Sequence, residues 1–198
     1  MTEASPRRAS IGARRNPATE AAVLTAARDV LAERGFAGFS IDEVARRAGA
    51  GKPTIYRWWP SRADLLLEVY SAERAARVAV PETGSLAGDL AALARAFLAA
   101  WRTSPAGQAL RGLIAEAQGS EPALVALWER FMPAWNQPVR SILGEGARRG
   151  EVDAADIEVL SELYSGFLWR RLLVGQTDDD RSAIDRMTRI LVSGRGRK

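Results

Sequence analysis

The sequence predicts an all-α fold of about nine helices, and two observations carry this prediction. Apolar residues recur at three- and four-residue spacing through almost the whole chain, which is the periodicity of helices with one buried face. Strand signals, meaning alternating β-branched and aromatic residues joined by hairpin turns, are absent. With 198 residues, 47% of them hydrophobic, the chain is long and apolar enough to bury a substantial core.

The first third of the chain predicts three helices in succession. Residues 18–34 carry apolar side chains at helical spacing and are followed by a glycine, a common helix stop. A second helix follows Ser40, which stands three residues before Glu43 in the spacing of a capping box, and it ends at Gly49. The third, Lys52–Trp59, is so short that it needs packing partners to be stable.

A fourth helix opens at a second capping-box pattern, formed by Ser61 and Asp64, and runs to about Arg77. The segment VPETGS then interrupts the helical periodicity. Beyond it, apolar spacing predicts five helices, at residues 86–102, 105–118, 121–149, 154–174 and 179–193. Pro133 and Pro138 should bend or split the third of these, because a proline inside a helix loses a hydrogen bond and clashes with the preceding turn.

Cysteine and histidine are both absent from the sequence. Their absence removes cysteine nucleophiles, Ser-His-Asp triads, disulfides and the usual ligands of zinc sites. We therefore expect a protein that is not an enzyme and has no metal or cofactor. No apolar run approaches the ~18 to 20 residues of a membrane-spanning helix, and the N-terminus lacks the apolar region of a secretion signal. We expect a cytoplasmic protein without a membrane partner.

Charge is distributed unevenly along the chain. Residues 1–62 hold eleven basic and six acidic side chains, whereas the remainder holds 17 basic and 18 acidic ones. The net charge of +4 therefore resides in the first third. Such asymmetry indicates that this end of the protein meets a polyanion, although a solvated basic tail would have the same composition.

The second and third helices are joined by the tight turn AGAG, as in a helix-turn-helix, whose second helix enters the DNA major groove. Ile55 and Trp59, four residues apart, predict the buried face of that second helix. Thr54, Arg57 and Trp58 should share the opposite face, with packing against the fourth helix as the alternative for Trp58. This short segment is therefore interpreted as a recognition helix.

The side chains of the short helix and its neighbours suit contact with a DNA duplex. Arg57 can form the bidentate contact with guanine that is common in specific recognition. Lys52 stands in the first turn and Tyr56 points laterally, where each can reach a phosphate. Ser40 and Arg62 begin the neighbouring helices, where they can grip the DNA backbone on either side.

The stretch GFAGFSIDEVARRAGAGKPTIYRWWPSRADLLLEVY resembles the signature of the TetR/AcrR family of transcriptional repressors, and the match covers about residues 18–70. By this resemblance the residues that face DNA are Thr54, Tyr56, Arg57 and Trp58. Arg62 takes the place of a family lysine that contacts phosphate. The sequence departs from the family pattern at Trp58, where a histidine is common, and Trp58 cannot accept a hydrogen bond.

We expect three parts in the chain: a flexible basic arm (1–17), a helix-turn-helix DNA-binding domain (18–62), and a helical domain for ligand binding and dimerisation (63–198). The resemblance implies a homodimer in which the last two helices pair with their copies. The candidate interface residues are Leu160, Leu163, Phe167, Ile184, Met187 and Leu191. The alternative is that these apolar stripes face the core of their own protomer.

The resemblance also implies an effector pocket in the larger domain. The candidate residues are Trp101, Ile114, Trp128, Phe131, Met132, Trp135 and Tyr164. They gather on the central helices, and few ionisable residues interrupt them, which favours a small, hydrophobic, neutral or cationic effector. The alternative is a filled aromatic core.

These expectations combine into a sequence-specific regulator that binds a palindromic operator as a dimer and responds to a ligand as a repressor. An activator would bind DNA in the same way. Two alternatives remain open, namely a DNA-binding protein that needs no ligand and an all-helical carrier of small molecules that does not bind DNA.

Overall fold

The computed structural model describes residues 16–193. The predicted basic arm, apart from its last two residues, and the C-terminal GRGRK segment lie outside this range. The α-helices are α1 (Pro17–Arg34), α2 (Ile41–Ala48), α3 (Lys52–Trp58), α4 (Arg62–Arg77), α5 (Leu86–Thr103), α6 (Pro105–Ala117), α7 (Glu121–Val125), α8 (Met132–Arg148), α9 (Ile157–Leu173) and α10 (Arg181–Ser193). A π-helical segment η1 (Ala126–Phe131) joins α7 to α8, and a 3-10 turn η2 (Ala154–Asp156) precedes α9.

The all-α prediction is confirmed for the described residues. Because α7, η1 and α8 follow one another without a break, the range 16–193 holds nine helical runs, in agreement with the sequence prediction. The long helix expected at 121–149 is split as the prolines suggested: Pro133 stands in the first turn of α8, just after η1, while Pro138 lies inside α8. Among these helices none is long and apolar enough to span a membrane.

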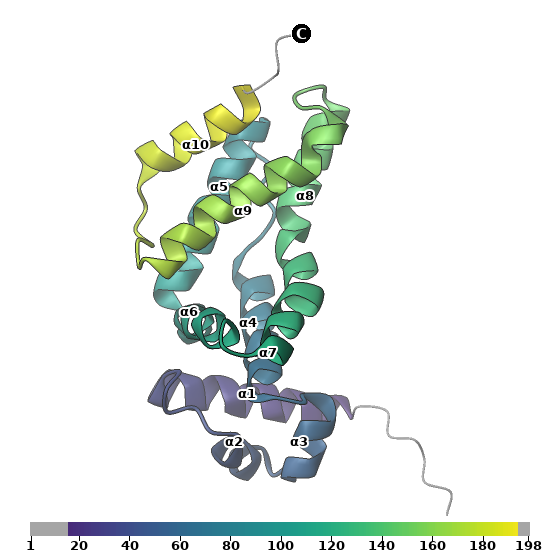
Figure 1. Ribbon diagram of the computed structural model, residues 1–198, viewed down its shortest axis with the longest axis vertical. Coiled ribbons are helices and arrows are strands. Elements are labelled where there is room, and N and C mark those ends of the chain that lie inside the picture. Colours follow the sequence, from purple (N-terminus) through teal and green to yellow (C-terminus); the bar gives the residue numbers. More distant parts are fainter. Residues whose placement is uncertain (1–15, 194–198) are drawn as a thin grey trace, which may run out of the picture.

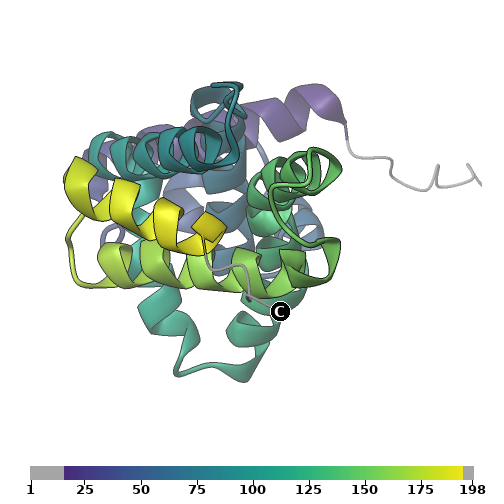
Figure 2. The ribbon, with the colours of Figure 1, turned by 90° about the horizontal axis from the view of Figure 1, so that it is seen from above.

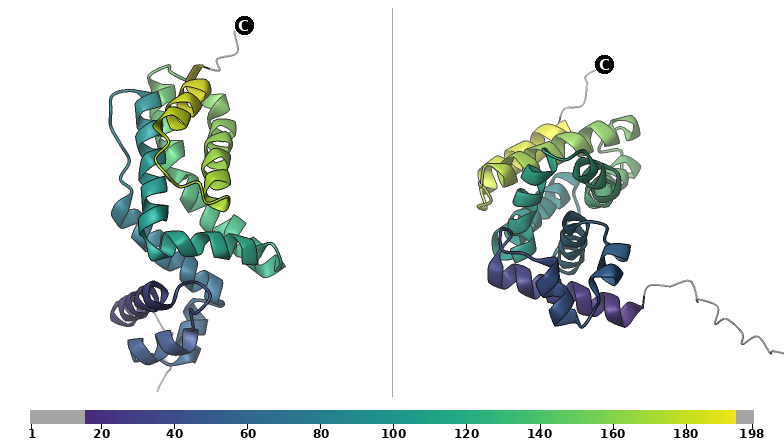
Figure 3. Two further views of the ribbon diagram at one scale, coloured as in Figure 1. Left: turned by 90° about the vertical axis from the view of Figure 1, so that its left-hand side faces the viewer. Right: turned by 60° about the horizontal axis from the view of Figure 1, so that its bottom comes forward.

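Helices α1, α2 and α3 form one end of the molecule, and α6 and α7 lie across them (Figures 1 and 3). Helix α4 packs against both α1 and α6 and so connects this end to the rest. In the larger part, α5 packs against α6, α8 and α10, and α9 packs against α8. Figure 2 shows α9 and α10 side by side on one face of this part. The division between two domains at residue 62 remains a prediction, since α4 begins there and contacts both ends.

The two capping-box patterns have different outcomes. At the start of α4, Asp64 N–H donates to Ser61 Oγ at 3.2 Å and Ser61 N–H donates to Asp64 Oδ2 at 3.0 Å, as predicted. At the start of α2, the side chain of Ser40 forms no capping hydrogen bond, so the capping box predicted there is wrong. The reason is that Glu43 is engaged by arginines instead of reaching back to Ser40.

Candidate DNA-binding surface and effector region

Helix α3 is held in place by three buried side chains, Ile55, Trp58 and Trp59, whose exposed fractions are 0%, 8% and 1%. The two indole rings meet edge to face at 5.7 Å between centroids. Trp59 Nε1–H donates to Glu68 Oε2 of α4 at 3.2 Å. The predicted buried pair of Ile55 and Trp59 is confirmed, and it fastens a two-turn helix that would be marginal alone.

The position expected for Trp58, on the exposed face opposite Ile55 and Trp59, is wrong. Residues three and four positions apart share one face of a helix. Ile55 is followed by Trp58 at the third position and Trp59 at the fourth, so all three turn inward. The packing alternative considered for Trp58 is the one that the structure supports, and contact with DNA would be limited to its small exposed fraction.

The opposite face of α3 presents polar side chains to solvent. Lys52, Tyr56 and Arg57 are exposed and Thr54 is half-buried. Lys52 Nζ lies 2.5 Å from Asp42 Oδ1 of α2, and the hydrogen bond to this carboxylate raises the pKa of Lys52 above its ordinary value. The guanidinium of Arg57 lies 5.8 Å from the ring centroid of Trp58, within the range of a cation–π contact. The face thus combines two cations and a phenol.

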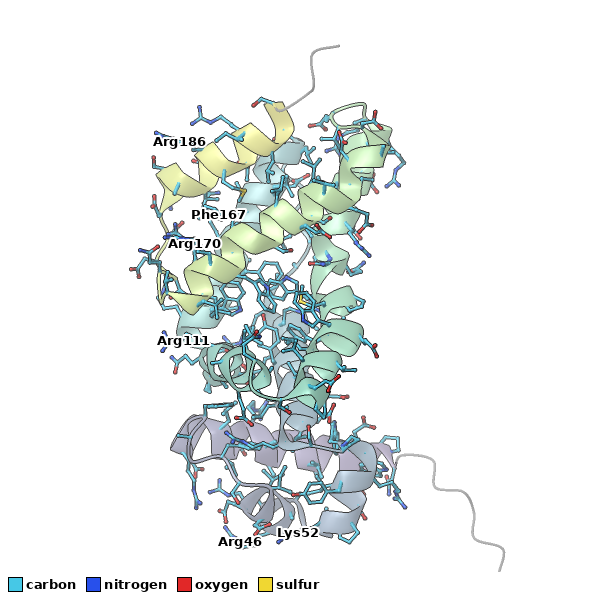
Figure 4. The ribbon with its side chains drawn as sticks, viewed as in Figure 1. Arg46, Lys52, Arg111, Phe167, Arg170 and Arg186 are labelled. Carbon is cyan, nitrogen blue, oxygen red and sulfur yellow. The ribbon has the colours of Figure 1, made fainter. Side chains whose placement is uncertain are left out.

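Helix α2 contributes two groups beside this face. Ser40 is half-buried, and its hydroxyl is not used as a helix cap. Arg46 was missed in the sequence analysis; its side chain is 70% exposed, and Figure 4 places it near Lys52 at the outer edge of the molecule. The signal that could have identified it is its position near the C-terminal end of the first helix of the helix-turn-helix.

A carboxylate cluster fixes α2 against α1. Glu43 Oε1 accepts hydrogen bonds from Arg46 Nη2 at 2.7 Å and from Arg47 Nε at 2.8 Å. Arg47 also donates to both carboxylate oxygens of Glu33 in α1, at 2.7 and 2.6 Å. The hydrogen bonds from Arg46 and then Arg47 lower the pKa of Glu43 from 4.5 to about 2. These bonds connect the side chains of α2 to Glu33 of α1.

Arg62 has partners that the sequence did not predict. Its Nη2–H donates to the carbonyl of Phe36, and its guanidinium lies 4.4 Å from the centroid of the Phe36 ring. Its Nη1 lies 3.6 Å from Glu116 Oε2 in α6. Arg62 therefore joins the helix-turn-helix to α6, and a phosphate contact would require it to leave these partners. Its assignment to DNA stays a prediction.

An aromatic cluster occupies the larger part of the molecule. Trp135 is at its centre, with ring centroids at 4.4 to 6.3 Å from those of its neighbours. Those neighbours are Tyr70, Phe97, Trp101, Phe131 and Trp169. The structure thus brings together Trp101, Phe131 and Trp135 of the predicted pocket. Tyr70, Phe97 and Trp169 were missed: Tyr70 lies on α4, while Phe97 and Trp169 share α5 and α9 with the predicted Trp101 and Tyr164.

A buried hydrogen bond ties this cluster to α4. Trp101 Nε1–H donates to the hydroxyl of Tyr70 at 2.9 Å. Burial raises the pKa of Tyr70 well above its ordinary value, so the phenol stays neutral. Because Tyr70 belongs to the same helix as Arg62, α4 contacts the aromatic cluster at one end and the helix-turn-helix at the other.

The other predicted pocket residues are dispersed. Ile114 and Tyr164 are buried, with the Tyr164 hydroxyl donating to the carbonyl of Leu90 at 2.9 Å, and Met132 is half-buried. Trp128 is 55% exposed and lines a separate surface groove with Leu124, so it does not join Trp101, Phe131 and Trp135 in the aromatic cluster. Trp128 lies in the π-helical segment η1.

The predicted dimer residues divide between the surface and the protomer core. Leu163 is 57% exposed, whereas Ile184 is fully buried, which makes the assignment of Ile184 to an interface wrong. Helix α10 turns Ile184 towards α5, so that residue serves the protomer's own core. The remaining four, Leu160, Phe167, Met187 and Leu191, are half-buried.

Two exposed apolar residues lie beside this set, and of these only Val159 was missed in the sequence analysis. Val159 is 57% exposed and lies one turn before Leu163 on α9. Ile190, on the neighbouring α10, is 62% exposed. Helix α9 is thus apolar on two faces, one facing the core through Tyr164 and Leu168 and the other facing solvent.

Comparison with protein families covers nearly the whole described chain. The family model described as "Bacterial regulatory proteins, tetR family" matches residues 23–69. The model described as "Tetracyclin repressor-like, C-terminal domain" matches residues 80–191. The first match includes α2, α3 and the first half of α4, and the second includes the aromatic residues of α5 and α8.

Individual proteins agree with these matches. An uncharacterized HTH-type transcriptional regulator, YdeS of Bacillus subtilis (strain 168), is 34% identical over 164 residues, covering 82% of this chain and 82% of YdeS. The DNA-binding transcriptional repressor TetR of Mycobacteroides abscessus is 29% identical over 168 residues, covering 84% and 88%. The crystal structure of the TetR family transcription regulator SCO0332 superposes with a TM-score of 0.78 at 29% identity, covering 89% of this chain and 97% of that one.

Proposed function

The chain belongs to the TetR family of transcriptional regulators, and we propose that it is a repressor that binds a palindromic operator as a homodimer and leaves it when a small effector binds. The observation that carries the proposal is the construction of α3. Its three buried side chains hold a two-turn helix rigidly, and its other face presents Lys52, Tyr56 and Arg57. A helix of this kind fits the major groove.

Within this surface, Arg57 is the candidate for base recognition and Lys52 for phosphate. Lys52 already has an anionic partner, Asp42, at 2.5 Å. A phosphate would replace that carboxylate, so Asp42 holds the ammonium group in place before DNA arrives. Arg46 and the hydroxyl of Ser40 extend the phosphate-binding surface along α2.

The dimer is proposed to form through α9 and α10. Val159 and Leu163 form an exposed apolar stripe on α9, and Ile190 adds to it from α10. Exposed apolar residues in a contiguous patch are typical of protein–protein interfaces. Two-fold pairing of this face would place two α3 helices to read two half-sites separated by about one or more helical turns, ~34 to 36 Å each.

Effector control is proposed to act through α4. Tyr70 connects α4 to the aromatic cluster, and Arg62 connects it to Phe36 and to Glu116 of α6. An effector that binds one arrangement of these helices more tightly than the other shifts the equilibrium by that difference in affinity. Release then requires only a changed separation of the two α3 helices. One protein of the same fold, FadR from Bacillus subtilis (19% identity, TM-score 0.61), has been crystallised with stearoyl-CoA.

The test is fluorescence anisotropy with the DNA flanking the protein's own gene and with random-sequence DNA, across a salt series. Two chains should bind one palindromic stretch, and salt should weaken the complex steeply. Arg57→Ala should cost about 1 to 3 kcal/mol on the operator and relax specificity, whereas Lys52→Ala should weaken all sequences alike and reduce the salt slope. Equal losses on both DNAs for both variants would contradict this division of roles, and no preference for any sequence would contradict the proposal.

A further inference from the structure

A cleft of about 260 Å³ lies where the end of α5 and the first half of α6 meet the connection between α9 and α10. Trp101 and Leu172 supply apolar walls, and Gln108 and Thr177 supply polar groups. Arg102 and Arg111 complete the lining. The cleft is separate from the helix-turn-helix surface and from the exposed stripe of α9 described above.

The charge of this cleft is uncompensated. Two of its lining residues are arginines and none is acidic. Within the part of the chain that the structure describes, Arg111 forms no ion pair, and Arg102 Nη1–H donates to a neutral group, the carbonyl of Thr177, at 3.3 Å. An arginine pair without a carboxylate is the arrangement that binds a planar anion through parallel N–H donors.

Two of the three aspartates that follow Thr177 are paired with arginines outside the cleft. Asp179 lies 3.7 Å from Arg95 and 3.4 Å from Arg181. Asp180 lies 3.8 Å from the buried Arg171. These two aspartates are therefore tied to other arginines and do not pair with Arg102 or Arg111.

Glycine shapes the wall next to Arg111. Gly175 has a positive φ of 73°, and a Cβ atom at this position would lie 3.3 Å from Arg111 Nη1. A larger residue would be strained there and would crowd the guanidinium. Figure 4 shows Arg111 on α6 and Arg170 on α9 on the same side of the molecule, so a further cation lies near this edge. Arg170 donates to the side chain of Gln176 at 3.2 Å.

Trp101, in the inner wall of the cleft, contacts α4, which continues to the DNA-binding end of the molecule. Trp101 stacks on Trp135 with a centroid separation of 5.4 Å and donates to the Tyr70 hydroxyl of α4 at 2.9 Å. A ligand that displaces Trp101 must therefore move or break a contact with α4. Trp101 thus connects the lining of the cleft to α4, the helix that carries Arg62.

We propose that this cleft binds a small carboxylic acid with an apolar body, and that this acid is an effector of DNA binding. The carboxylate lies between Arg102 and Arg111, and the apolar body lies against Trp101 and Leu172. A volume of about 260 Å³ suits a molecule with a single ring. The effector role rests on the proposed function, whereas binding of the acid does not.

Isothermal titration calorimetry with the full chain tests the binding, using benzoate and phenylacetate with benzamide and phenylacetamide as neutral counterparts. Each acid should bind at millimolar concentration or below, and its amide should bind at least about tenfold more weakly. Arg111→Gln and Arg102→Gln should each weaken binding of the acids about tenfold. Arg186→Gln removes an exposed arginine of α10 and serves as the matched charge control.

The results that would overturn carboxylate binding differ from those that would overturn the effector role. If neither acid binds, or if the amides bind equally well, the cleft is not a carboxylate site. The same conclusion follows if Arg186→Gln weakens binding as much as Arg111→Gln. If the acids bind as expected but operator anisotropy is unchanged in their presence, the effector role is refuted. Failure of the unliganded protein to bind any operator would instead contradict the proposed function.

Discussion

The two tryptophan clusters of this protein serve different purposes. In the helix-turn-helix, Trp58 and Trp59 are neighbours in sequence and support a face of α3 that functions by being exposed. In the larger part, Trp101, Trp135 and Trp169 come from three helices and pack against one another, and this cluster is where we propose that effector control reaches α4. A buried aromatic side chain can therefore support a surface from behind, as Trp58 and Trp59 do, or form part of the lining of a cleft, as Trp101 does.

Replacing one tryptophan from each cluster should have the largest effect. Trp59→Ala and Trp135→Ala each remove a large side chain that is at most 2% exposed, so each should lower the free energy of unfolding by about 3 to 5 kcal/mol. Urea unfolding followed by circular dichroism measures this loss. Among molecules that remain folded, Trp59→Ala should also abolish operator binding, since α3 loses its packing against Glu68 and α4.

Trp135→Ala should leave operator binding of the folded fraction close to wild type, because none of the rings that contact Trp135 belongs to α3. Equal loss of DNA binding in both variants at matched folded fraction would remove the distinction between the clusters. A destabilisation below about 1 kcal/mol for Trp135→Ala would contradict its description as a packed centre of the aromatic cluster.

The buried hydrogen bond between the cluster and α4 should be next in magnitude. Tyr70→Phe keeps the ring but leaves Trp101 Nε1–H without an acceptor in a buried site, which should cost about 1 to 3 kcal/mol of stability. Tyr56→Phe removes an equivalent hydroxyl from a side chain that is 46% exposed and should change stability by less than about 0.5 kcal/mol. Chemical denaturation of both variants makes the comparison, and equal effects would contradict the buried role of Tyr70.

The smallest effect concerns the pH dependence of the carboxylate cluster that joins α1 and α2 through Glu43, Arg47 and Glu33. The pKa of Glu43 falls from an ordinary 4.5 to about 2 in the folded protein, through its hydrogen bonds to Arg46 and Arg47. A lowered folded pKa means that its stabilising contribution is complete above pH 4.5 and is lost as the pH falls towards 2. Glu43→Gln should therefore lower stability at neutral pH slightly and flatten the acid limb of the stability profile.

Thermal unfolding of wild type and Glu43→Gln between pH 2 and pH 7 measures this difference. The two curves should converge at the acidic end, where the carboxyl of the wild type is protonated. Curves that remain parallel over the whole range would show that Glu43 is not the group responsible. Such an outcome would leave the hydrogen-bond distances as the only support for a stabilising role of Glu43.

Local sequence signals succeeded where neighbouring residues decide the outcome. The pattern of Ser61 and Asp64 forms its capping box because both partners lie within one turn of the same helix start. The same spacing at Ser40 and Glu43 does not, because Arg46 and Arg47 claim the carboxylate and Glu33 of another helix positions Arg47. A pattern in one helix cannot reveal a partner that arrives from another.

The errors at longer range have the same origin. Trp128 was grouped with Phe131 and Trp135 as a pocket residue, but it lies in the π-helical segment η1 and its side chain is exposed. Ile184 belonged to an apolar stripe of α10, but only the packing of that helix against α5 determines which part of the stripe is covered. Periodicity finds an apolar face and does not say what lies against it.

By itself, the sequence determined the all-α class, the approximate ranges of the helices and the presence of the short third helix, because hydrogen bonding and capping within a helix depend on residues a few positions apart. Tertiary structure alone decided that Trp58 is buried, that Arg62 joins the helix-turn-helix to α6, and that Arg102 and Arg111 line one cleft. These features depend on contacts between helices distant in sequence, and such contacts form only when the chain has packed its core.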